Sequence, residues 1–384
     1  MIIIAISSFI LVSYLFLIAA ISLGWWKLKV FTRTDLLPEV KVSIIVAVRN
    51  EAGNIITLLN SLSNQDYPSA LCEIIIVNDQ SDDQTARLVE EFIAKYIDGK
   101  NLKLITLGEN DTPGKKSAIA RGIQASTGEL IVITDGDCIA GRKWISNLAS
   151  FYTNYRPQMI LGPVRMIDGG SFFGKLQSLE FSSLLSAAAG SSSAGFPVLA
   201  NGANIAFTRE AYENCGGFYG NTQYPSGDDM FLMMSIKKQF GTKAIRFLRS
   251  DDAIVNTPAT PGLKPFFQQR MRWVSKSRGY TDTMLIATSI IVFLTNGLMA
   301  ATAFAIMLNP WYFKFFLIVY GTKLLIDLPL MLSYTKFQQT RSLLWLFPLM
   351  ELANAFYTLI IGIAGNFGGY IWKGRRVFTQ RVGR

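Results

Sequence analysis

Two aspartates one residue apart, in the stretch ITDGDC, carry the clearest chemical signal in this 384-residue sequence. Asp135 and Asp137 follow a short apolar run, and at the end of a strand both carboxylates can turn toward one ion. Carboxylate oxygens are hard ligands that suit Mg²⁺ or Mn²⁺, ions that proteins usually share with substrate phosphates. An Asp-x-Asp pair alone is a weak signal, so its meaning depends on what the fold brings beside it.

Strand-like and helix-like stretches alternate between residues 40 and 265, which predicts an α/β domain with a mostly parallel sheet and helices on both faces. VSIIVAV, CEIIIVND, LKLIT and ELIVITDGD have the apolar runs of buried strands, and helical spacing separates them. Ligands of such sheets bind beyond the carboxyl ends of the strands. We therefore expect residues 49–51, Asp79 and the Asp-x-Asp pair to meet at one edge.

The composition excludes several kinds of chemistry. The chain has no histidine, which removes the usual general base, the serine–histidine triads and most zinc sites. Cys72, Cys138 and Cys215 are widely spaced and are interpreted as small core residues in a reducing compartment. No G-x-G-x-x-G follows the first strand, and TPGKKS lacks P-loop spacing. The net charge of +10 comes with no nucleic-acid-binding motif, so we expect no nucleic-acid partner.

Apolar runs at both ends of the chain predict membrane segments. Residues 2–26 are uncharged, more than the roughly 20 residues that a spanning helix needs. Lys27, Lys29 and Arg33 follow this run, so the positive-inside rule places the next segment, with the α/β domain, in the cytoplasm. Further runs at 283–313, 312–334 and 342–372 predict two to three crossings, the last open to a re-entrant path. A basic tail follows.

These patterns divide the chain into four parts. We predict an N-terminal anchor at 1–37, the α/β domain at 38–265, a basic interfacial helix at 266–282, and a membrane region with the basic tail at 283–384. Lys323 and Asp327 are spaced i,i+4 and are interpreted as a buried structural pair, with a polar lining of a substrate path as the alternative. Residues 171–207 predict either an interface-lying helix with an acceptor-side loop or an ordinary packed helix.

Taken together, the motifs resemble membrane-bound family 2 glycosyltransferases with the GT-A fold. The segments that carry the resemblance are VSIIVAVRNE, VNDQSDDQT, PGKKSAIARGI, ITDGDC, LANGANIAFTREAYENCGGF, SGDDMFLM and QRMRW, in family order over residues 42–273. Ceramide-glucosyltransferase-like and processive β-glycosyltransferases, which share the Gln-x-x-Arg-Trp motif, are similar in layout. The resemblance implies an inverting hexosyltransferase with a GT-A nucleotide-sugar domain.

The resemblance also implies roles for single residues. The nucleotide side is expected at Ala47, Arg49, Asn50, Glu51, Asp79, Lys115 and Asp135. Asp137 is the more direct metal ligand, with Asp135 as its partner. Asp229 falls on the general base and Asp228 beside it takes a supporting place, where the family has Glu. Asn201, Gly202 and Asn204 are weaker candidates near the sugar.

The Gln-x-x-Arg-Trp motif lies just before the first C-terminal apolar run. Gln269, Arg272 and Trp273 share one helix face because they are spaced i, i+3, i+4. Arg272 is expected to bind the diphosphate, and Trp273 and Gln269 to contact the acceptor. Other charges of the segment, Arg270, Lys276 and Arg278, are expected to touch anionic lipid.

Three functions follow from these residues. The first is metal-dependent transfer of a sugar from a nucleotide-sugar, with uridine as the expected carrier, to a membrane-lipid acceptor. The second is a processive synthase that exports a β-linked glycan. The three C-terminal apolar runs favour the first function, because a secretion channel needs more helices. The third is a noncatalytic membrane receptor with a nucleotide-sensing domain.

Overall fold

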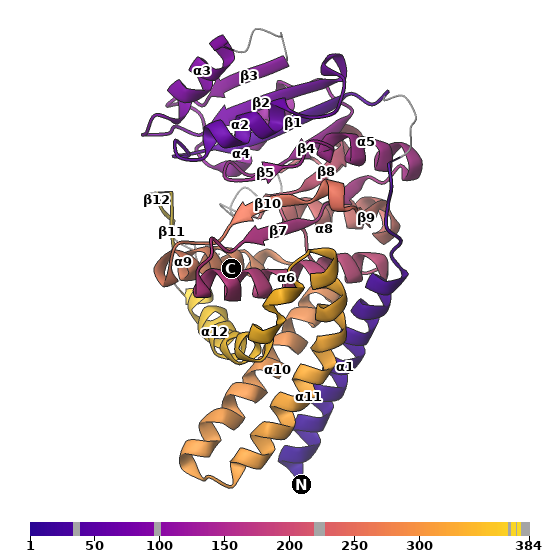
Figure 1. Ribbon diagram of the computed structural model, residues 1–384, viewed down its shortest axis with the longest axis vertical. Coiled ribbons are helices and arrows are strands. Elements are labelled where there is room, and N and C mark those ends of the chain that lie inside the picture. Colours follow the sequence, from indigo (N-terminus) through magenta and orange to yellow (C-terminus); the bar gives the residue numbers. More distant parts are fainter. Residues whose placement is uncertain (34–38, 96–100, 219–226, 368–369, 374, 378–384) are drawn as a thin grey trace. The chain divides into compact units, whose positions relative to one another are not determined.

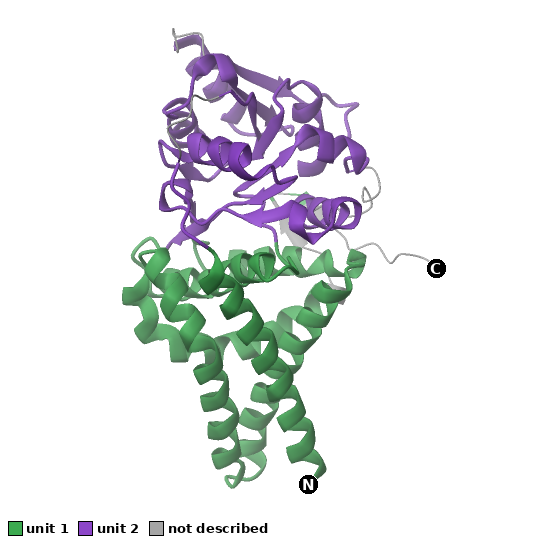
Figure 2. Ribbon diagram, turned by 90° about the vertical axis from the view of Figure 1, so that its right-hand side faces the viewer, with its two compact units in different colours: residues 1–28, 168–199, 259–384 green, residues 29–167, 200–258 purple. Residues whose placement is uncertain are grey.

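The computed structural model describes residues 1–33, 39–95, 101–218, 227–367, 370–373 and 375–377 (Figure 1). These residues form two compact units (Figure 2). Unit 1 contains residues 1–28, 168–199 and 259–384, and unit 2 contains residues 29–167 and 200–258. The segment 168–199 lies within the range predicted as the α/β domain, yet it groups with the helices of unit 1. The predicted boundary at residue 37 lies outside the described residues.

A seven-stranded sheet forms the centre of unit 2. Its strands, in spatial order, are β3 (Asn101–Thr106), β2 (Cys72–Asn78), β1 (Val42–Val48), β4 (Leu130–Ile133), β8 (Ile205–Thr208), β6 (Met159–Leu161) and β9 (Ile245–Phe247). The pairs β1–β2, β1–β4, β2–β3 and β6–β9 are parallel, whereas β8 runs antiparallel to β4 and β6. The predicted mostly parallel sheet is confirmed, with β8 as an antiparallel insertion.

The three central strands, β1, β2 and β4, are buried along almost their whole length, which explains why their sequences are almost continuously apolar. Ile44 of β1, Ile75 of β2 and Val132 of β4 are fully buried. Parallel strands covered on both faces are apolar along their whole length rather than at alternate positions, which is the pattern that these segments show. Because the strands are parallel and adjacent, their carboxyl ends lie at one edge of the sheet.

Helices and a small second sheet complete unit 2. The helices are α2 (Ile55–Ser63), α3 (Thr85–Lys95), α4 (Lys115–Gln124), α5 (Trp144–Tyr155), α7 (Arg209–Asn214) and α8 (Asp228–Phe240), and the second sheet has the order β5 (Ile139–Ala140), β10 (Val255–Pro258), β7 (Val164–Ile167). Helix α4 lies close to β1 and β2 because residue 122 is glycine. A Cβ there would lie 2.5 Å from Ile45 and 3.1 Å from Val77. This packing fixes the position of α4, whose first residue is Lys115.

Unit 1 is built from long helices. They are α1 (Ile2–Lys27), α6 (Phe172–Ser193), α9 (Leu263–Ser275), α10 (Thr283–Leu308), α11 (Tyr312–Phe337) and α12 (Phe347–Phe367), followed by the hairpin β11 (Tyr370–Trp372) and β12 (Arg375–Val377). Short 3-10 turns occur in both units at Ser69–Leu71, Thr242–Ala244, Asp251–Ala253, Ser277–Gly279 and Arg341–Leu346. The end of the predicted basic tail, residues 378–384, lies outside the described residues.

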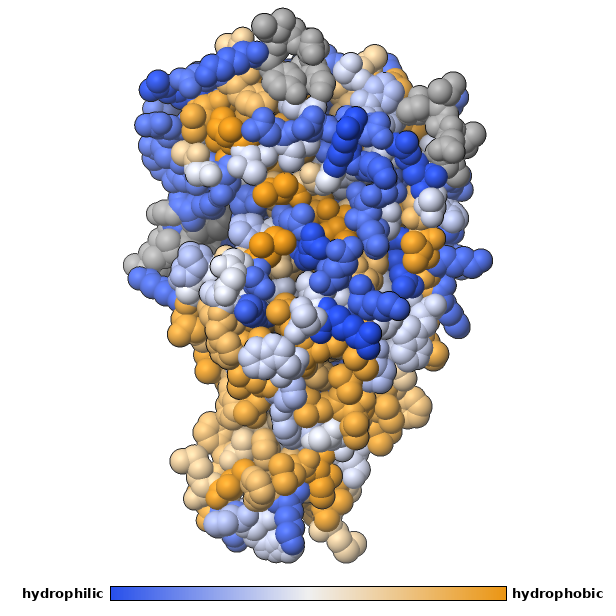
Figure 3. Space-filling view, in the orientation of Figure 1, coloured by the Kyte–Doolittle hydropathy of each residue, from blue (hydrophilic) through white to orange (hydrophobic). Residues whose placement is uncertain are grey.

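Four stretches of the described chain are long and apolar enough to cross a membrane: α1, α10, α11 and residues 341–365. One is N-terminal and three are C-terminal, as predicted. Figure 3 shows the apolar surface that these helices present. Phe16, Phe304 and Leu325 are 71%, 58% and 73% exposed. Exposure of such large apolar side chains is unfavourable in water but not in lipid. These helices indicate a membrane protein.

Charged side chains are buried among these helices. The Lys323 ammonium lies 2.9 Å from the Asp327 carboxylate and also pairs with Glu351. The Tyr14 hydroxyl of α1 donates a hydrogen bond of 2.8 Å to Asp327. The structure thus confirms Lys323 and Asp327 as a buried pair, and adds that the pair joins α11 to α1 and α12.

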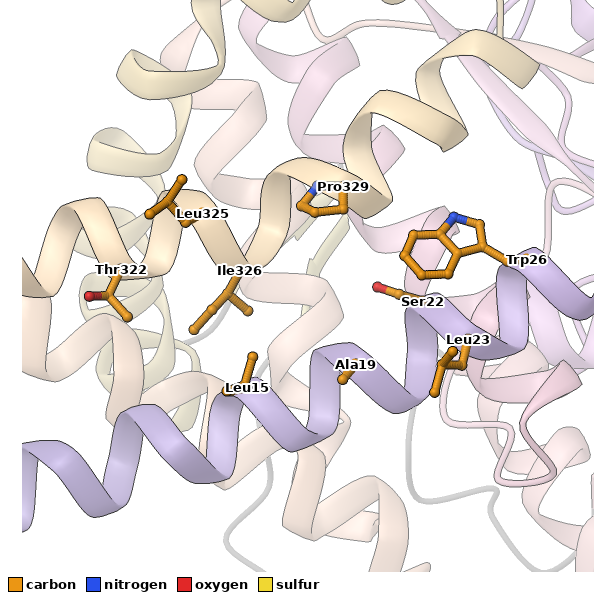
Figure 4. A pocket seen from close by; sticks show the side chains of 9 residues that line it. All are labelled: Leu15, Ala19, Ser22, Leu23, Trp26, Thr322, Leu325, Ile326 and Pro329. Atoms are coloured by element: carbon orange, nitrogen blue, oxygen red, sulfur yellow. The ribbon is translucent and has the colours of Figure 1, made fainter.

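An apolar groove of about 480 Å³ lies between α1 and α11 (Figure 4). It is lined by Leu15, Ala19, Ser22, Leu23, Trp26, Thr322, Leu325, Ile326 and Pro329. None of these nine residues is charged, so the groove offers hydrophobic contact and two hydroxyl groups but no acid–base or metal chemistry. The Asp-x-Asp pair and Asp79 lie in unit 2.

Candidate active site

The loops after β1 and β2 interlock at the carboxyl edge of the sheet. The Arg49 guanidinium donates to the carbonyl oxygens of Asp79, at 2.8 Å, and Gln80. It also lies 2.8 Å from the Asp82 carboxylate. Arg49 is 7% exposed, and these contacts occupy its guanidinium. The resemblance implies that Arg49 faces the nucleotide, and in this structure it holds together the loop that would do so.

A left-handed residue completes this connection. Asn50 has φ of 52°, a conformation that Asn tolerates better than most residues. Its backbone N–H donates to Ser81 Oγ at 3.1 Å, and its side-chain oxygen accepts from the Asp82 N–H at 2.9 Å. Glu51 follows and is 6% exposed, with its N–H donating to Thr85 Oγ1. The predicted residues 49–51 and Asp79 are thus brought together.

Asp79 connects this edge to the start of α4. It is 1% exposed, and its Oδ1 accepts a hydrogen bond of 3.0 Å from the backbone N–H of Gly114. Gly114 has φ of 126°, a region that favours glycine. Because Gly114 immediately precedes α4, Asp79 helps to fix where Lys115 begins the helix.

Lys115 lies at the centre of the acidic residues. Its Nζ is 2.6 Å from Asp135 Oδ1 and 3.6 Å from Asp228 Oδ2. Burial by itself would lower the pKa of Lys115, but the negative charges of Asp135 and then Asp228 outweigh it and raise the pKa well above its ordinary value. Lys115 is therefore positively charged at neutral pH, at the meeting point of two loops and a helix.

The residues after β4 fit a divalent cation. Asp135, Asp137 and Cys138 each offer one ligand atom, and these atoms lie within 4.8 Å of one another. The two carboxylates suit a hard ion, whereas a thiol suits a soft one. Burial, followed by the charge of Asp137, raises the pKa of the Cys138 thiol well above its ordinary value. The donor set thus suits a hard divalent ion at the two carboxylates, and Cys138 is a buried core residue, as predicted.

The start of α8 supplies two more carboxylates. Asp228 is 4% exposed, and Asp229 presents both oxygens to backbone N–H groups. Asp229 Oδ2 accepts from Gly202 at 3.1 Å, and Oδ1 accepts from Met230 at 2.7 Å. These bonds and the first turn of α8 hold the Asp229 carboxylate in one orientation.

The loop before β8 separates the three weaker candidates. A Cβ on Gly202 would lie 3.2 Å from Lys115 Nζ, so Gly202 lies within the site. Asn204 is 1% exposed and bonds Trp144, Pro163 and Ala253, which makes it a structural residue. Asn201 accepts from the Ala203 N–H at 3.0 Å within its own loop. Gly114, whose N–H donates to Asp79, was not predicted as a site residue, although its place before a lysine and a helix is visible in the sequence.

Gln269, Arg272 and Trp273 belong to α9 in unit 1, whereas the acidic site belongs to unit 2. One expectation for α9 is wrong. Arg270, expected at anionic lipid, is 3% exposed and forms an ion pair with Glu180 of α6. The sequence could not reveal this, because the partner is 90 residues away.

Comparisons with known proteins identify the family of the chain. A family model described as "Glycosyl transferase family 2" matches residues 43–216. A second, described as "Glycosyl transferase family group 2", matches residues 130–361. The second match alone covers more than half of the chain, and the two together include every residue of the acidic site.

Three curated relatives show the range of similar proteins. The chain is 31% identical over 132 residues to glycosyltransferase AglE of Haloferax volcanii, covering 34% of this chain and 42% of AglE. It is 27% identical over 239 residues to poly-beta-1,6-N-acetyl-D-glucosamine synthase of Staphylococcus epidermidis, covering 60% and 53%. It is 33% identical over 96 residues to beta-monoglucosyldiacylglycerol synthase of Trichormus variabilis, covering 25% and 20%. The chain thus matches about half or less of the length of these relatives.

Among solved structures, the mannosyltransferase PcManGT from Pyrobaculum calidifontis, in complex with GDP-Man and Mn²⁺, is similar to this protein. The TM-score is 0.55 at 18% identity, and the match covers 91% of this chain and 99% of that one. At this identity the likeness concerns the fold, and it supports a GT-A-type sheet with helices.

Proposed function

Since the chain belongs to glycosyl transferase family 2 and is a glycosyltransferase, we propose that it moves a sugar from a nucleotide-sugar to a membrane-lipid acceptor with inversion at the anomeric carbon. Uridine is the proposed nucleoside of the donor. Membership in this family favours an enzyme over the alternative of a noncatalytic receptor.

The observation that carries the proposal is the convergence of separated residues around Lys115. Asp79 fixes the amide that precedes Lys115, and Asp135 and Asp228 lie within 3.6 Å of its ammonium. Asp229 joins them through the Gly202 amide. A positive group among carboxylates at a sheet edge is suited to a diphosphate that shares a divalent ion.

The proposed reaction is a single displacement. Asp229, oriented by two amides, takes the proton of the acceptor hydroxyl. At the same time the oxygen of that hydroxyl attacks the anomeric carbon, and the nucleoside diphosphate leaves from the opposite side. General-base assistance of this kind is worth about 10²–10⁴ in rate. Asp135 and Asp137 would hold the divalent ion, which when bound neutralises charge on the leaving diphosphate. Lys115 adds a second positive group, and Asp228 keeps Lys115 in place.

A lipid acceptor is supported by two features. Four candidate membrane helices make up much of unit 1, and one relative is named a beta-monoglucosyldiacylglycerol synthase. The proposed orientation, with unit 2 in the cytoplasm, rests on the basic residues that follow α1. In this reading Arg272 binds the diphosphate, and Gln269 and Trp273 contact the acceptor.

A second candidate is a processive synthase. It is favoured by the match to poly-beta-1,6-N-acetyl-D-glucosamine synthase over 60% of the chain. The two candidates share the chemistry of the acidic site and differ in the product. A single added sugar in the mass spectrum supports the lipid glycosyltransferase, and a ladder of masses supports the synthase.

The test is transfer of labelled sugar from a panel of nucleotide-sugars to membrane lipid extract, with the product identified by mass. Asp229→Asn should lower transfer by about 10²–10⁴ while nucleotide-sugar binding persists. Asp252→Asn is the matched control, because this carboxylate is 54% exposed on the same unit. Near-normal transfer by Asp229→Asn would exclude it as the base.

A second variant tests the metal site. Asp137→Ala should abolish the dependence of transfer on Mn²⁺ or Mg²⁺ together with most of the activity. Unchanged metal dependence would remove Asp137 from the proposed ligand set.

A further inference from the structure

We propose that the buried pair Arg270–Glu180 positions Gln269 and Trp273, the two motif residues assigned to the acceptor. This inference rests on the proposed function, and it makes α6 the support on which α9 is held. It gives Arg270 a role through its neighbours rather than through direct contact with substrate.

Arg270 contacts both motif residues. Its Nη1 donates a hydrogen bond of 2.6 Å to Gln269 Oε1. Its guanidinium carbon lies 4.1 Å from the centroid of the Trp273 ring and 4.6 Å from that of Phe266. A planar guanidinium between two aromatic rings restricts the rings as well as itself. One side chain therefore limits the orientation of an amide and an indole on the same helix.

Glu180 holds Arg270 in turn. One carboxylate oxygen pairs with Arg270 Nη2, and the other accepts a hydrogen bond of 2.6 Å from the Tyr357 hydroxyl of α12. Phe181, the next residue of α6, lies with its ring centroid 6.3 Å from that of Trp273. The pair thus connects α9 to two other helices of unit 1.

A second contact, one turn away on α6, fixes the approach to α9. Gln177 donates from Nε2 to the Thr260 carbonyl at 3.0 Å. Its Oε1 accepts from the Thr260 N–H at 3.1 Å and from the hydroxyl at 2.7 Å. Because Gln177 and Glu180 are spaced i,i+3, they lie on one face of α6. This face therefore contacts both Thr260, which precedes α9, and Arg270, in the middle of α9.

A contribution to stability does not by itself explain why Arg270 and Glu180 are buried together. A buried ion pair is often no more stabilising than apolar residues of similar volume. Arg270 also leaves its buried Nε without a hydrogen-bond partner among the described residues, which is unfavourable. The pair instead places the Arg270 guanidinium against both Gln269 and Trp273. An apolar side chain at position 270 could not hold these two residues in the same orientation.

The experiment compares Arg270→Met, Glu180→Met and the double variant. Each single variant leaves one charge buried, so its melting temperature should fall, whereas the double variant should recover. Transfer should not recover: kcat/KM for the acceptor should stay down by about 10- to 100-fold, the scale of a misplaced substrate. Nucleotide-sugar binding should remain unchanged. Lys264→Met, which removes an exposed charge of the same helix, is the matched control and should match wild type.

Recovery of both melting temperature and acceptor kcat/KM in the double variant would overturn the inference. If the double variant fails to fold, Arg270→Lys decides, because it keeps the charge but not the planar contacts. About a tenfold loss in kcat/KM is expected, and full activity would refute the proposal. If wild type transfers no sugar, the proposed function fails instead. In that case the inference is tested by amide hydrogen exchange of residues 263–275, which must be faster in Arg270→Met than in wild type.

Discussion

Lys115→Met should separate two properties of the acidic site. The substitution keeps the length and apolar stem of the side chain but removes the ammonium that lies 2.6 Å from Asp135 and 3.6 Å from Asp228. In the nucleotide-free protein, this ammonium competes with a divalent cation for Asp135. During transfer, the same charge favours the departing diphosphate. We therefore expect Lys115→Met to bind Mn²⁺ more tightly and to transfer sugar more slowly.

The magnitude follows from these distances. At an effective dielectric of about 20, the Coulomb energies with Asp135 and Asp228 are about 6 and 5 kcal/mol. Asp135 is 37% exposed in its side chain, so solvent screening reduces the net value, which we place at about 1–3 kcal/mol. Because about 1.4 kcal/mol corresponds to a factor of ten, the dissociation constant for Mn²⁺ should fall by about 5- to 150-fold.

The assay measures Mn²⁺ binding calorimetrically without nucleotide, and transfer at saturating Mn²⁺. Transfer should fall by about tenfold or more, on the scale of a lost charge at the transition state. Lys143→Met is the control, because this lysine is 54% exposed on the same unit. Unchanged Mn²⁺ affinity combined with normal transfer would refute the assignment of Lys115 to the shared centre of the site.

Three further predictions concern other parts of the molecule. Gly202→Ala should place a methyl group 3.2 Å from Lys115 Nζ, lowering transfer about tenfold with little change in melting temperature, because the lysine end can shift. Lys323→Met leaves two buried carboxylates without their cation. It should lower the free energy of unfolding in detergent by about 3–5 kcal/mol, whereas substitution of the exposed Lys314 of the same helix by Met should not. Hydrogen bonds outweigh burial and lower the pKa of Glu73 below its ordinary 4.5. The stability advantage of wild type over Glu73→Gln should therefore be complete above that value and disappear as pH falls through the lowered pKa, as denaturant titrations would show.

Much of the acidic site was predictable from the sequence because local rules govern it. Asp79 and Asp135 each follow a continuous apolar run, and parallel strands place such residues at one edge. The long apolar runs likewise predicted one N-terminal and two to three C-terminal membrane helices, and the structure has one and three candidates. Gly202 and Asn204 could not be told apart in the same way. They are two residues apart in one loop, and only the fold puts one against Lys115 and the other against Trp144.

The charges of α9 show the same limit. Arg270 and Arg272 have similar neighbours in the sequence, yet Arg270 is buried because Glu180, on a distant segment, approaches it. The sequence by itself determined the first four strands, their acidic ends and the apolar helices, since these depend on local patterns of burial and charge. The tertiary structure alone decided which distant charges are paired, such as Arg270 with Glu180, and which glycine lies at the site, because such contacts depend on segments that are far apart in the chain.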